Sequence, residues 1–247
     1  MRGKEAGYRA DVIFRWILID QTSAGDRAFL ETLLSEDERQ AALALRFEED
    51  RAAYVAAHAL ARALLAARTG RAARDWAFRA GLHGKPRPIA RPGEPDIRLN
   101  LSHTRGLAAV ALCVGREIGV DVEWMGQPAP FEVAEQIFAP AERDLLDAHR
   151  PDERPEVFYR LWTLKEAYLK ATACGLARAP VSCVFALDPP RLLKSECDPD
   201  PARWHLRLYR IEAAYMASLA YDAGASSRIS VSAAPADLAR LRAASGN

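Results

Sequence analysis

Two carboxylates, Asp121 and Glu123, stand two residues apart in an otherwise apolar segment, residues 119–123. In a β-strand, side chains two residues apart point to the same face, so both carboxylates would lie on one side of a sheet. Two like charges at that separation repel by about 1–4 kcal/mol, and a divalent cation that prefers oxygen ligands removes this repulsion. The segment predicts a metal-binding pair or, as the alternative, an edge strand with a solvated acidic face.

A second group of polar side chains lies in the longest helical pattern of the chain, residues 156–174. Glu166 and Lys170 are four residues apart and therefore share one face of that helix. One interpretation is a surface ion pair that contributes little to stability. The other assigns Glu166 to a metal ion and Lys170 to a phosphate oxygen. The spacing leaves both interpretations open.

Two turns offer groups that bind phosphate. Residues 100–104 place Ser102 and His103 where a predicted strand enters a turn, and residues 84–86 form a Gly-Lys-Pro turn that presents Lys85. Hydroxyl, imidazole and ammonium groups all donate hydrogen bonds to phosphate oxygens. A structural histidine and an ordinary surface turn are the alternatives.

The elements that must position these residues follow from hydrophobic periodicity. Strand patterns with β-branched and apolar residues alternate with helical patterns that bury every third or fourth residue. The predicted strands cover residues 11–20, 97–101, 107–114, 117–123, 181–187, 204–212, 216–221 and 229–232, and the predicted helices cover residues 35–47, 51–69, 131–138, 141–149 and 156–174.

This order of elements predicts an α+β fold, because helices and strands are segregated along the chain. One plan of helices followed by strands occurs twice, so we expect two similar α+β lobes related by a pseudo-twofold axis. The expected N-terminal lobe covers residues 1–118 and the C-terminal lobe covers residues 119–234. Residues 235–247, rich in alanine and arginine, are expected to form a loose tail.

Composition excludes several classes of protein. The net charge of +1 argues against a general nucleic-acid-binding protein. The longest apolar runs are too short to cross a bilayer, and no signal peptide is expected. The four cysteines form no zinc-ligand or Cys-x-x-Cys pattern, so thiols in a reducing cytoplasm are the simplest account.

In combination, the motifs resemble one family. In chain order, Gly-Lys-Pro (84–86), Asn-x-Ser-His (100–103), Gly-Val-Asp-Val-Glu (119–123) and the segment of residues 158–170 resemble the motif series of the surfactin-synthetase type of 4'-phosphopantetheinyl transferase. The resemblance covers about residues 35–176, and the chain length is similar to the two-lobed form rather than to the half-length, trimeric form. The resemblance therefore implies a monomer.

The resemblance implies an activity and a set of site residues. The family transfers the 4'-phosphopantetheine moiety of coenzyme A to a serine of an apo acyl or peptidyl carrier protein in fatty acid, polyketide or nonribosomal peptide biosynthesis, and adenosine 3',5'-bisphosphate leaves. Coenzyme A is expected between the two lobes. Asp121, Glu123 and Glu166 match ligands of Mg²⁺ (with Mn²⁺ as an alternative), while Glu123, Glu166 and Lys170 match catalytic residues, and Lys85, Ser102 and His103 match coenzyme A contacts.

The sequence departs from the family pattern near the first helices. The family often has basic residues there that bind the 3'-phosphate of coenzyme A, and this chain has Glu38 at one such position. Arg39, Arg46 and Arg51 lie nearby in the sequence. We expect one or more of these arginines to bind the phosphate, with Arg46 and Arg51 as the candidates.

Two other functions remain as alternatives. One is a different coenzyme A-dependent transferase, for which three acids at the pyrophosphate would have no purpose. The other is a non-catalytic module that binds carrier proteins. For docking of the carrier, we expect an exposed apolar patch between residues 125 and 138, with the alternative that this loop packs on the core. The expected patch consists of Met125, Pro128, Pro130, Phe131 and Phe138.

Overall fold

The chain divides into two compact units in the computed structural model, which describes residues 11–81, 84–174, 180–224 and 229–245. Unit 1 comprises Met1–Gly81, Pro86–Gly115 and Arg228–Asn247, and unit 2 comprises Leu82–Lys85 and Arg116–Ser227. Both units contain helices and largely antiparallel strands, so the prediction of an α+β fold is confirmed.

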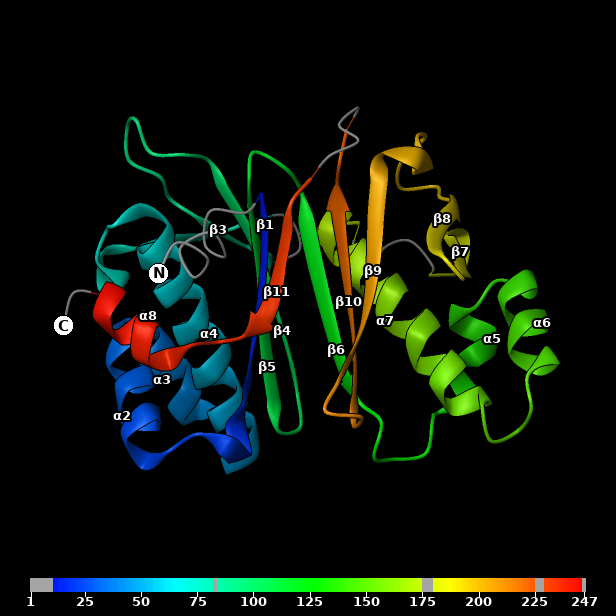
Figure 1. Ribbon diagram of the computed structural model, residues 1–247, viewed down its shortest axis with the longest axis horizontal. Helices are drawn as coiled ribbons and strands as arrows, with labels where there is room; N and C mark the ends of the chain where they lie inside the picture. The colour runs from blue at the N-terminus through cyan, green and yellow to red at the C-terminus, as the bar shows by residue number, and fades with distance from the viewer. Residues whose placement is uncertain (1–10, 82–83, 175–179, 225–228, 246–247) are drawn as a thin grey trace. The chain divides into compact units, whose positions relative to one another are not determined.

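Unit 1 is a four-stranded sheet with helices packed against it (Figure 1). The strand order is β11-β1-β5-β4, and all neighbouring pairs are antiparallel except β1 with β11. A separate two-stranded ribbon consists of β2 and β3. The elements of unit 1 are β1 (Val12–Leu18), α2 (Ala24–Leu33), α3 (Glu36–Ala44), α4 (Glu48–Thr69), β2 (Phe78–Ala80), β3 (Pro86–Pro88), β4 (Ile97–Thr104), β5 (Leu107–Val114), β11 (Val231–Pro235) and α8 (Leu238–Ala244).

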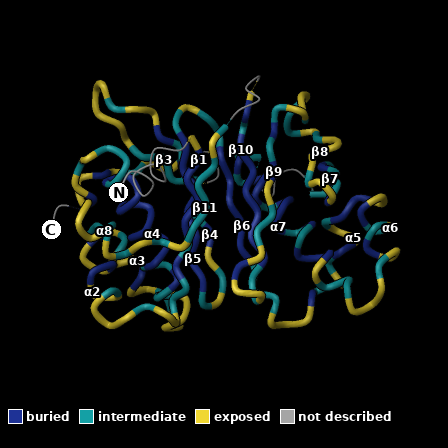
Figure 2. The backbone as a smooth tube through the Cα atoms, viewed as in Figure 1, coloured by how far each residue is buried: buried dark blue, intermediate teal, exposed yellow. Residues whose placement is uncertain are grey.

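Local signals explain the helices of unit 1. Ser35 accepts a hydrogen bond from the Glu38 backbone N–H, and the Glu38 carboxylate accepts one from Ser35 N, so the predicted capping box is present. Helix α4 ends at Gly70, whose φ of 78° is the left-handed conformation expected there. Helix α4 packs on β4 and β5, and the buried side of the helix forms part of the core of unit 1 (Figure 2).

The C-terminal segment differs from the prediction. Residues 235–247 were expected to be a loose tail, and β11 was expected in the C-terminal lobe. Instead, β11 pairs in parallel with β1, and Leu241 of α8 is fully buried in the core of unit 1. The physical reason is that β11 covers an edge of β1 that would otherwise present unpaired backbone groups.

Unit 2 is a three-stranded antiparallel sheet, ordered β6-β10-β9, with the long helix α7 across one face. Helix α6 and a two-stranded ribbon, β7 with β8, pack beside α7. The elements are β6 (Ile118–Trp124), α5 (Ala134–Ile137), α6 (Pro140–Ala148), α7 (Arg154–Thr172), β7 (Val184–Leu187), β8 (Pro190–Lys194), β9 (Trp204–Ile211) and β10 (Tyr215–Asp222).

Helix α7 lies unusually close to β6 because Gly119 has no side chain. A Cβ atom at Gly119 would lie 1.9 Å from the Ala167 carbonyl oxygen and 2.5 Å from the Ala171 backbone nitrogen. Both contacts are with helix backbone, which cannot swing aside as the end of a side chain can. The glycine that opens the predicted acidic segment therefore sets the separation of strand and helix.

We expect Gly119→Ala to destabilise the protein by about 1–3 kcal/mol or more, because the methyl group must push α7 away from β6. Urea denaturation monitored by circular dichroism measures this change. Gly25→Ala is the matched control, since Gly25 lies in α2 and its Cβ would approach only Ser23 Oγ, at 3.8 Å. Equal stability of the two variants would contradict the packing argument.

Candidate functional site

Strand β6 and helix α7 bring together Asp121, a predicted metal ligand, and Lys170, a predicted catalytic residue. Asp121 is 4% exposed, and its carboxylate Oδ1 accepts a hydrogen bond of 2.6 Å from Lys170 Nζ. The i, i+4 ion pair between Glu166 and Lys170 was one interpretation of the sequence. In the structure the lysine reaches across from α7 to Asp121 of β6.

The hydroxyl pair behind this ion pair ties α7 to the sheet. Thr163 Oγ1 donates to the Tyr159 carbonyl oxygen at 2.8 Å and lies 2.5 Å from Ser218 Oγ. Ser218 is the register partner of Asp121 on the neighbouring strand β10. Buried hydroxyls that satisfy each other fix the rotation of α7 and thereby the position of Lys170 relative to Asp121.

Two of the three carboxylates, those of Glu123 and Glu166, have raised pKa values. Burial, followed by the charge of Asp121, raises the pKa of Glu123 to about 7, although Lys170 and a hydrogen bond from the Trp162 side chain oppose this shift. Burial and Asp121 also raise the pKa of Glu166 above its ordinary value. Carboxylates that resist ionisation in this way favour a cation at the same point.

The donor set at this point suits a hard divalent cation, since it consists of carboxylate oxygens. Within the described ranges, however, no three acidic, histidine or cysteine side chains already stand in an arrangement that could hold a metal ion. The ammonium group of Lys170 lies 2.6 Å from Asp121 Oδ1 and is the cation that the structure places beside this carboxylate.

Lys85, which was predicted to contact coenzyme A, makes hydrogen bonds within unit 2. Its ammonium group donates to the Ile118 carbonyl oxygen at 2.8 Å, the Ala171 carbonyl oxygen at 3.2 Å and Glu117 Oε2 at 3.3 Å. The side chain, 8% exposed, connects β6 with the end of α7.

Ser102 and His103 lie in unit 1, within strand β4 rather than in a turn. They pair with Ala109 and Ala108 of β5, and the strand continues to Thr104. Successive strand residues point to opposite faces, which explains why Ser102 is buried and His103 is exposed. The two side chains therefore cannot both contact a phosphate on the same face.

The arginines proposed for the 3'-phosphate mainly serve helix α3. Arg51 donates from Nε to the Ala42 carbonyl oxygen at 3.3 Å and from Nη2 to the Leu45 carbonyl oxygen at 3.2 Å, and it pairs with Glu48 at 2.8 Å. These contacts satisfy carbonyl groups at the helix C-terminus. Arg46 stacks over the Phe47 ring at 5.2 Å.

Glu38, which stands at a position that the family often fills with a basic residue, has an internal partner. Its carboxylate accepts a 2.6 Å hydrogen bond from Arg62 Nε, and Arg62 is 2% exposed. His58 Nδ1 lies 3.3 Å from the same carboxylate. Hydrogen bonds from these two residues outweigh burial and hold the pKa of Glu38 at about 2. The acidic residue at position 38 is therefore explained by the buried guanidinium group of Arg62 on the neighbouring helix α4.

One buried ion pair in unit 2 was not predicted. Lys165 Nζ lies 2.7 Å from Glu142 Oε2, and both side chains are at most 2% exposed. The remaining Glu142 contacts are with the backbone N–H groups of Ala139 and Phe185, at 2.8 and 2.9 Å. The sequence did contain a signal for this ion pair: Lys165, next to Glu166, is a charged residue on an otherwise apolar face of the helix.

The predicted docking patch is only partly exposed. Phe131 is 41% exposed and Pro128 is exposed, whereas Phe138 is fully buried, so its assignment to the surface was wrong. Phe138 packs edge-on against Phe158 of α7 at 5.1 Å, which removes it from solvent. Phe131 lines an open hollow of about 510 Å³ together with Arg143 and residues of α5 and α6.

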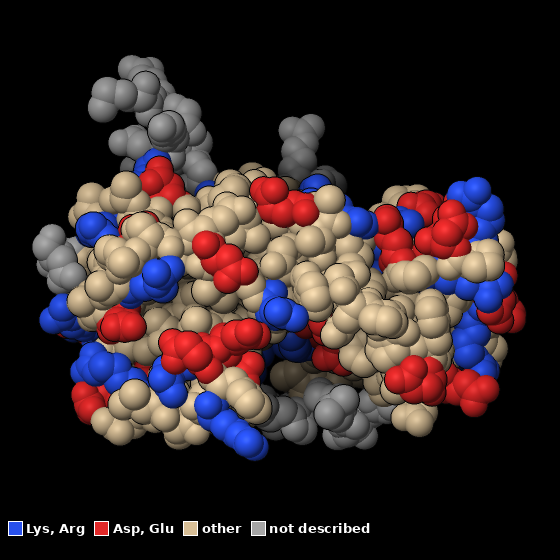
Figure 3. All heavy atoms as spheres, turned by 90° about the horizontal axis from the view of Figure 1, so that it is seen from below, with Lys and Arg blue, Asp and Glu red and all other residues tan. Residues whose placement is uncertain are grey.

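Acidic and basic side chains are interspersed on the face of the molecule that Figure 3 shows. The net charge of +1 agrees with this mixture. Long-range electrostatic attraction of a partner by the whole protein is therefore weak. Within the described residues, no helix is both long and apolar enough to cross a membrane, and the four cysteines form no disulfide.

Comparison with known proteins identifies the family. Residues 117–220, which include β6 and α7, match the model of the 4'-phosphopantetheinyl transferase superfamily. The chain is 33% identical to the 4'-phosphopantetheinyl transferase HetI of Nostoc sp. over 171 residues, covering 68% of this chain and 72% of that protein. Sfp of Bacillus subtilis is 28% identical over 141 residues, covering 57% and 61%. The chain belongs to the 4'-phosphopantetheinyl transferase superfamily, and its resemblance to the surfactin type is confirmed.

A solved structure also matches part of the chain. The holo-[acyl-carrier-protein] synthase of Thermotoga maritima is similar over 43% of this chain and 62% of its own, with 23% identity and a TM-score of 0.36.

Proposed function

We propose that the protein transfers the 4'-phosphopantetheine moiety of coenzyme A to a serine of an apo acyl or peptidyl carrier protein and releases adenosine 3',5'-bisphosphate. The observation that carries this proposal is the convergence of Asp121, Glu123, Glu166 and Lys170 at β6 and α7, inside the segment that matches the superfamily. Family membership supports the substrate class.

The reaction exchanges one phosphate bond for another. The serine hydroxyl oxygen forms a bond to the β-phosphorus of coenzyme A, and the pyrophosphate bond to the adenosine bisphosphate breaks. Such transfers depend mainly on positioning and on neutralising phosphate charge. Lys170, held 2.6 Å from Asp121, supplies a cation for the departing phosphate.

The serine proton requires an acceptor. Glu123 and Glu166 are the two candidates, and the raised pKa of Glu123, about 7, suits proton transfer near neutral pH. A carboxylate that holds a metal ion is a weaker base, and both glutamates are proposed ligands of the ion. Proton transfer through a water molecule between the serine and one of these carboxylates is therefore part of the proposal.

Asp121, Glu123 and Glu166 would hold Mg²⁺ or Mn²⁺, because these carboxylates are hard oxygen ligands that repel one another without a cation. When bound, the ion supplies Lewis-acid neutralisation of phosphate charge. The four cysteines are free thiols, and this is what we expect of a protein in a reducing cytoplasm. We also expect the protein to be a monomer, and light scattering tests this.

The expected test result is that chelation with EDTA abolishes transfer and that added Mg²⁺ or Mn²⁺ restores it. The substrates are coenzyme A and an apo carrier protein, and the measurements are the mass gain of the carrier and release of adenosine 3',5'-bisphosphate. Release of free coenzyme A without that nucleotide would indicate a different coenzyme A-dependent transferase. No product of either kind, with carrier still bound, would indicate a non-catalytic module. Full activity in excess chelator would contradict the metal requirement.

For carrier recognition, we expect Phe131→Ala to raise the KM for the carrier protein about tenfold and leave the KM for coenzyme A unchanged. The exposed ring lies beside the hollow that Arg143 also lines, and aromatic residues dominate such contacts. Steady-state kinetics with each substrate varied in turn measures both constants. Leu43→Ala is the control, because Leu43 is an exposed apolar side chain outside this hollow. A carrier KM that does not change in the Phe131 variant would exclude this docking surface.

A further inference from the structure

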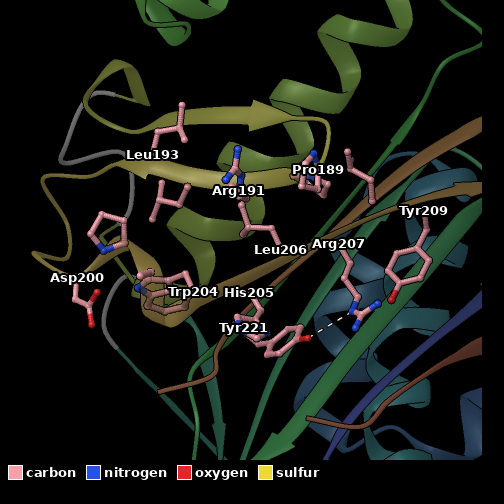
Figure 4. Close-up of a pocket in the computed structure, with 15 residues that line it drawn as sticks. Pro189, Arg191, Leu193, Asp200, Trp204, His205, Leu206, Arg207, Tyr209 and Tyr221 are labelled. Carbon is pink, nitrogen blue, oxygen red and sulfur yellow. Dashed lines mark hydrogen bonds between the residues drawn. The ribbon is translucent and has the colours of Figure 1, made fainter. Parts of the chain in front are cut away.

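An open groove of about 950 Å³ lies in unit 2 between strands β8 and β9 (Figure 4). Its floor is apolar, with Leu192, Trp204 and Leu206 each at most 8% exposed. The 3-10 turn Pro201–Arg203 also borders the groove. None of the residues in the proposed transfer site lines it.

Two arginines face this groove without an acidic partner. Arg191 comes from β8 and Arg207 from β9, and both are exposed. Arg207 Nε donates to the Tyr221 hydroxyl at 3.4 Å. In the described part of the chain, neither guanidinium group has a carboxylate within ion-pair distance. Asp200 is the one acid among the described lining residues, so positive charge is in excess.

Two neighbouring arginines of unit 2 differ from Arg191 and Arg207, because each has an acidic partner. Arg203 pairs with Asp222 and Asp198, and Arg210 pairs with Glu156 at 2.6 Å. Arg203 and Arg210 are therefore matched by acids of the same unit. The two that face the groove are left with guanidinium donors directed at solvent, and such donors bind carboxylates in a bidentate manner.

The groove follows the edge of a sheet. Residues 190–193 of β8 and residues 204–209 of β9 line it. Within the described residues, β9 pairs with β10 on one side and has no ladder partner on its outer side. The backbone N–H and C=O groups along such an edge can pair with an added extended polypeptide.

We propose that this groove binds an extended acidic polypeptide segment, with its carboxylates on Arg191 and Arg207 and its apolar side chains over Trp204 and Leu193. Tryptophan, tyrosine and arginine are the residues enriched at protein interfaces, and all three line the groove. The groove is open, whereas sites for small molecules enclose most of the ligand. This inference is independent of the transfer reaction.

The probe for this proposal is a fluorescent decapeptide of alternating glutamate and valine, with a lysine-valine decapeptide as its charge-reversed counterpart. Fluorescence polarisation without coenzyme A measures binding to the full chain. We expect the glutamate peptide to bind and the lysine peptide to bind at least about tenfold more weakly. Raising the salt concentration should weaken the glutamate complex, because the arginines are exposed.

Arg191→Ala and Arg207→Ala should each reduce the affinity about tenfold to a hundredfold, which is the loss of one charge-assisted contact. Arg207→Lys should retain more affinity than Arg207→Ala. Arg150→Ala is the matched control, since Arg150 is 71% exposed and does not line the groove. Thermal midpoints and transfer activity, measured on the same variants, should stay at the wild-type values.

Three results would overturn the proposal. The first is affinity for the glutamate peptide that is unchanged in both alanine variants. The second is equal affinity for the two peptides. The third is displacement of the glutamate peptide by an equimolar concentration of inorganic phosphate, which would identify a small-anion site instead of a polypeptide site. Loss of transfer activity alone would leave peptide binding intact, so failure of the proposed function is distinguishable from failure of this inference.

Discussion

Lys165→Met is expected to lower the free energy of unfolding by about 3–5 kcal/mol, which is the typical cost of breaking a buried ion pair. Lys165 and Glu142 are at most 2% exposed and 2.7 Å apart, so the variant leaves the Glu142 carboxylate buried without its cation. Lys165 also donates to the Pro180 and Cys183 carbonyl oxygens, and both lose a donor. Urea denaturation at neutral pH measures the difference.

The double variant Lys165→Met with Glu142→Gln separates charge from packing. Glutamine keeps a carbonyl oxygen for the Ala139 and Phe185 N–H groups but carries no charge, so we expect it to recover part of the lost stability. Lys194→Met is the matched control, because Lys194 is exposed on β8. If Lys165→Met stays within about 1 kcal/mol of the wild type, the pair does not have the role that its burial indicates.

The sequence predicts what depends on local patterns. The capping box at Ser35 and the left-handed Gly70 follow from residue type and spacing alone, and the structure has both. The alternation in residues 119–123 correctly places Asp121 and Glu123 on the face that α7 covers. Helix α2 was not predicted, although Ser23 caps it with a hydrogen bond from Asp26 N.

Contacts between residues far apart in the chain were beyond prediction. Nothing in a Gly-Lys-Pro turn shows that Lys85 reaches the Ile118 and Ala171 carbonyl oxygens. In the same way, the partner of Glu38 is Arg62, 24 residues away. Strand β11 joins β1 across more than 200 residues, so helical or strand periodicity carried no information about that pairing. Each of these contacts depends on the tertiary fold, whereas sequence periodicity reports only which residues share a face.

The site shows what a motif predicts and what it does not. The sequence predicted that Glu166 and Lys170 share one helical face, and it left Glu166 and a phosphate oxygen open as partners of the lysine. In the structure Lys170 pairs with Asp121 of β6 at 2.6 Å. A motif therefore identifies the participants, and strand–helix packing decides which of them meet.

Glu166→Gln is expected to reduce kcat/KM for transfer by about a hundredfold to a thousandfold while the protein remains folded. The variant keeps the shape of the side chain and removes one of the three charges proposed to bind the cation, and the loss of one well-placed electrostatic group typically has this effect. Measurement of holo-carrier formation at saturating Mg²⁺ gives the rate. Glu156→Gln is the control, since Glu156 lies on the same helix, is exposed and pairs with Arg210.

Replacing Glu123 is expected to lower the transfer rate but to raise the stability of the protein in the presence of chelator. Glu123 has a pKa of about 7 in the folded protein, above its ordinary value of 4.5, because of burial and the charge of Asp121. The folded state therefore binds this proton more tightly than the unfolded chain does. Ionisation of Glu123 lowers stability as the pH rises from about 4.5 through 7, and the whole cost is present above that range.

Glu123→Gln should thus be more stable than the wild type at pH 8, with a difference that shrinks toward pH 5, whereas its transfer rate should fall at every pH. Denaturation series at several pH values, in EDTA, measure the difference. Near-normal turnover of a Glu123 or Glu166 variant would show that the replaced residue does not belong to the transfer site. A Glu123 variant less stable than the wild type at pH 8 would show that the Glu123 carboxylate stabilises the fold.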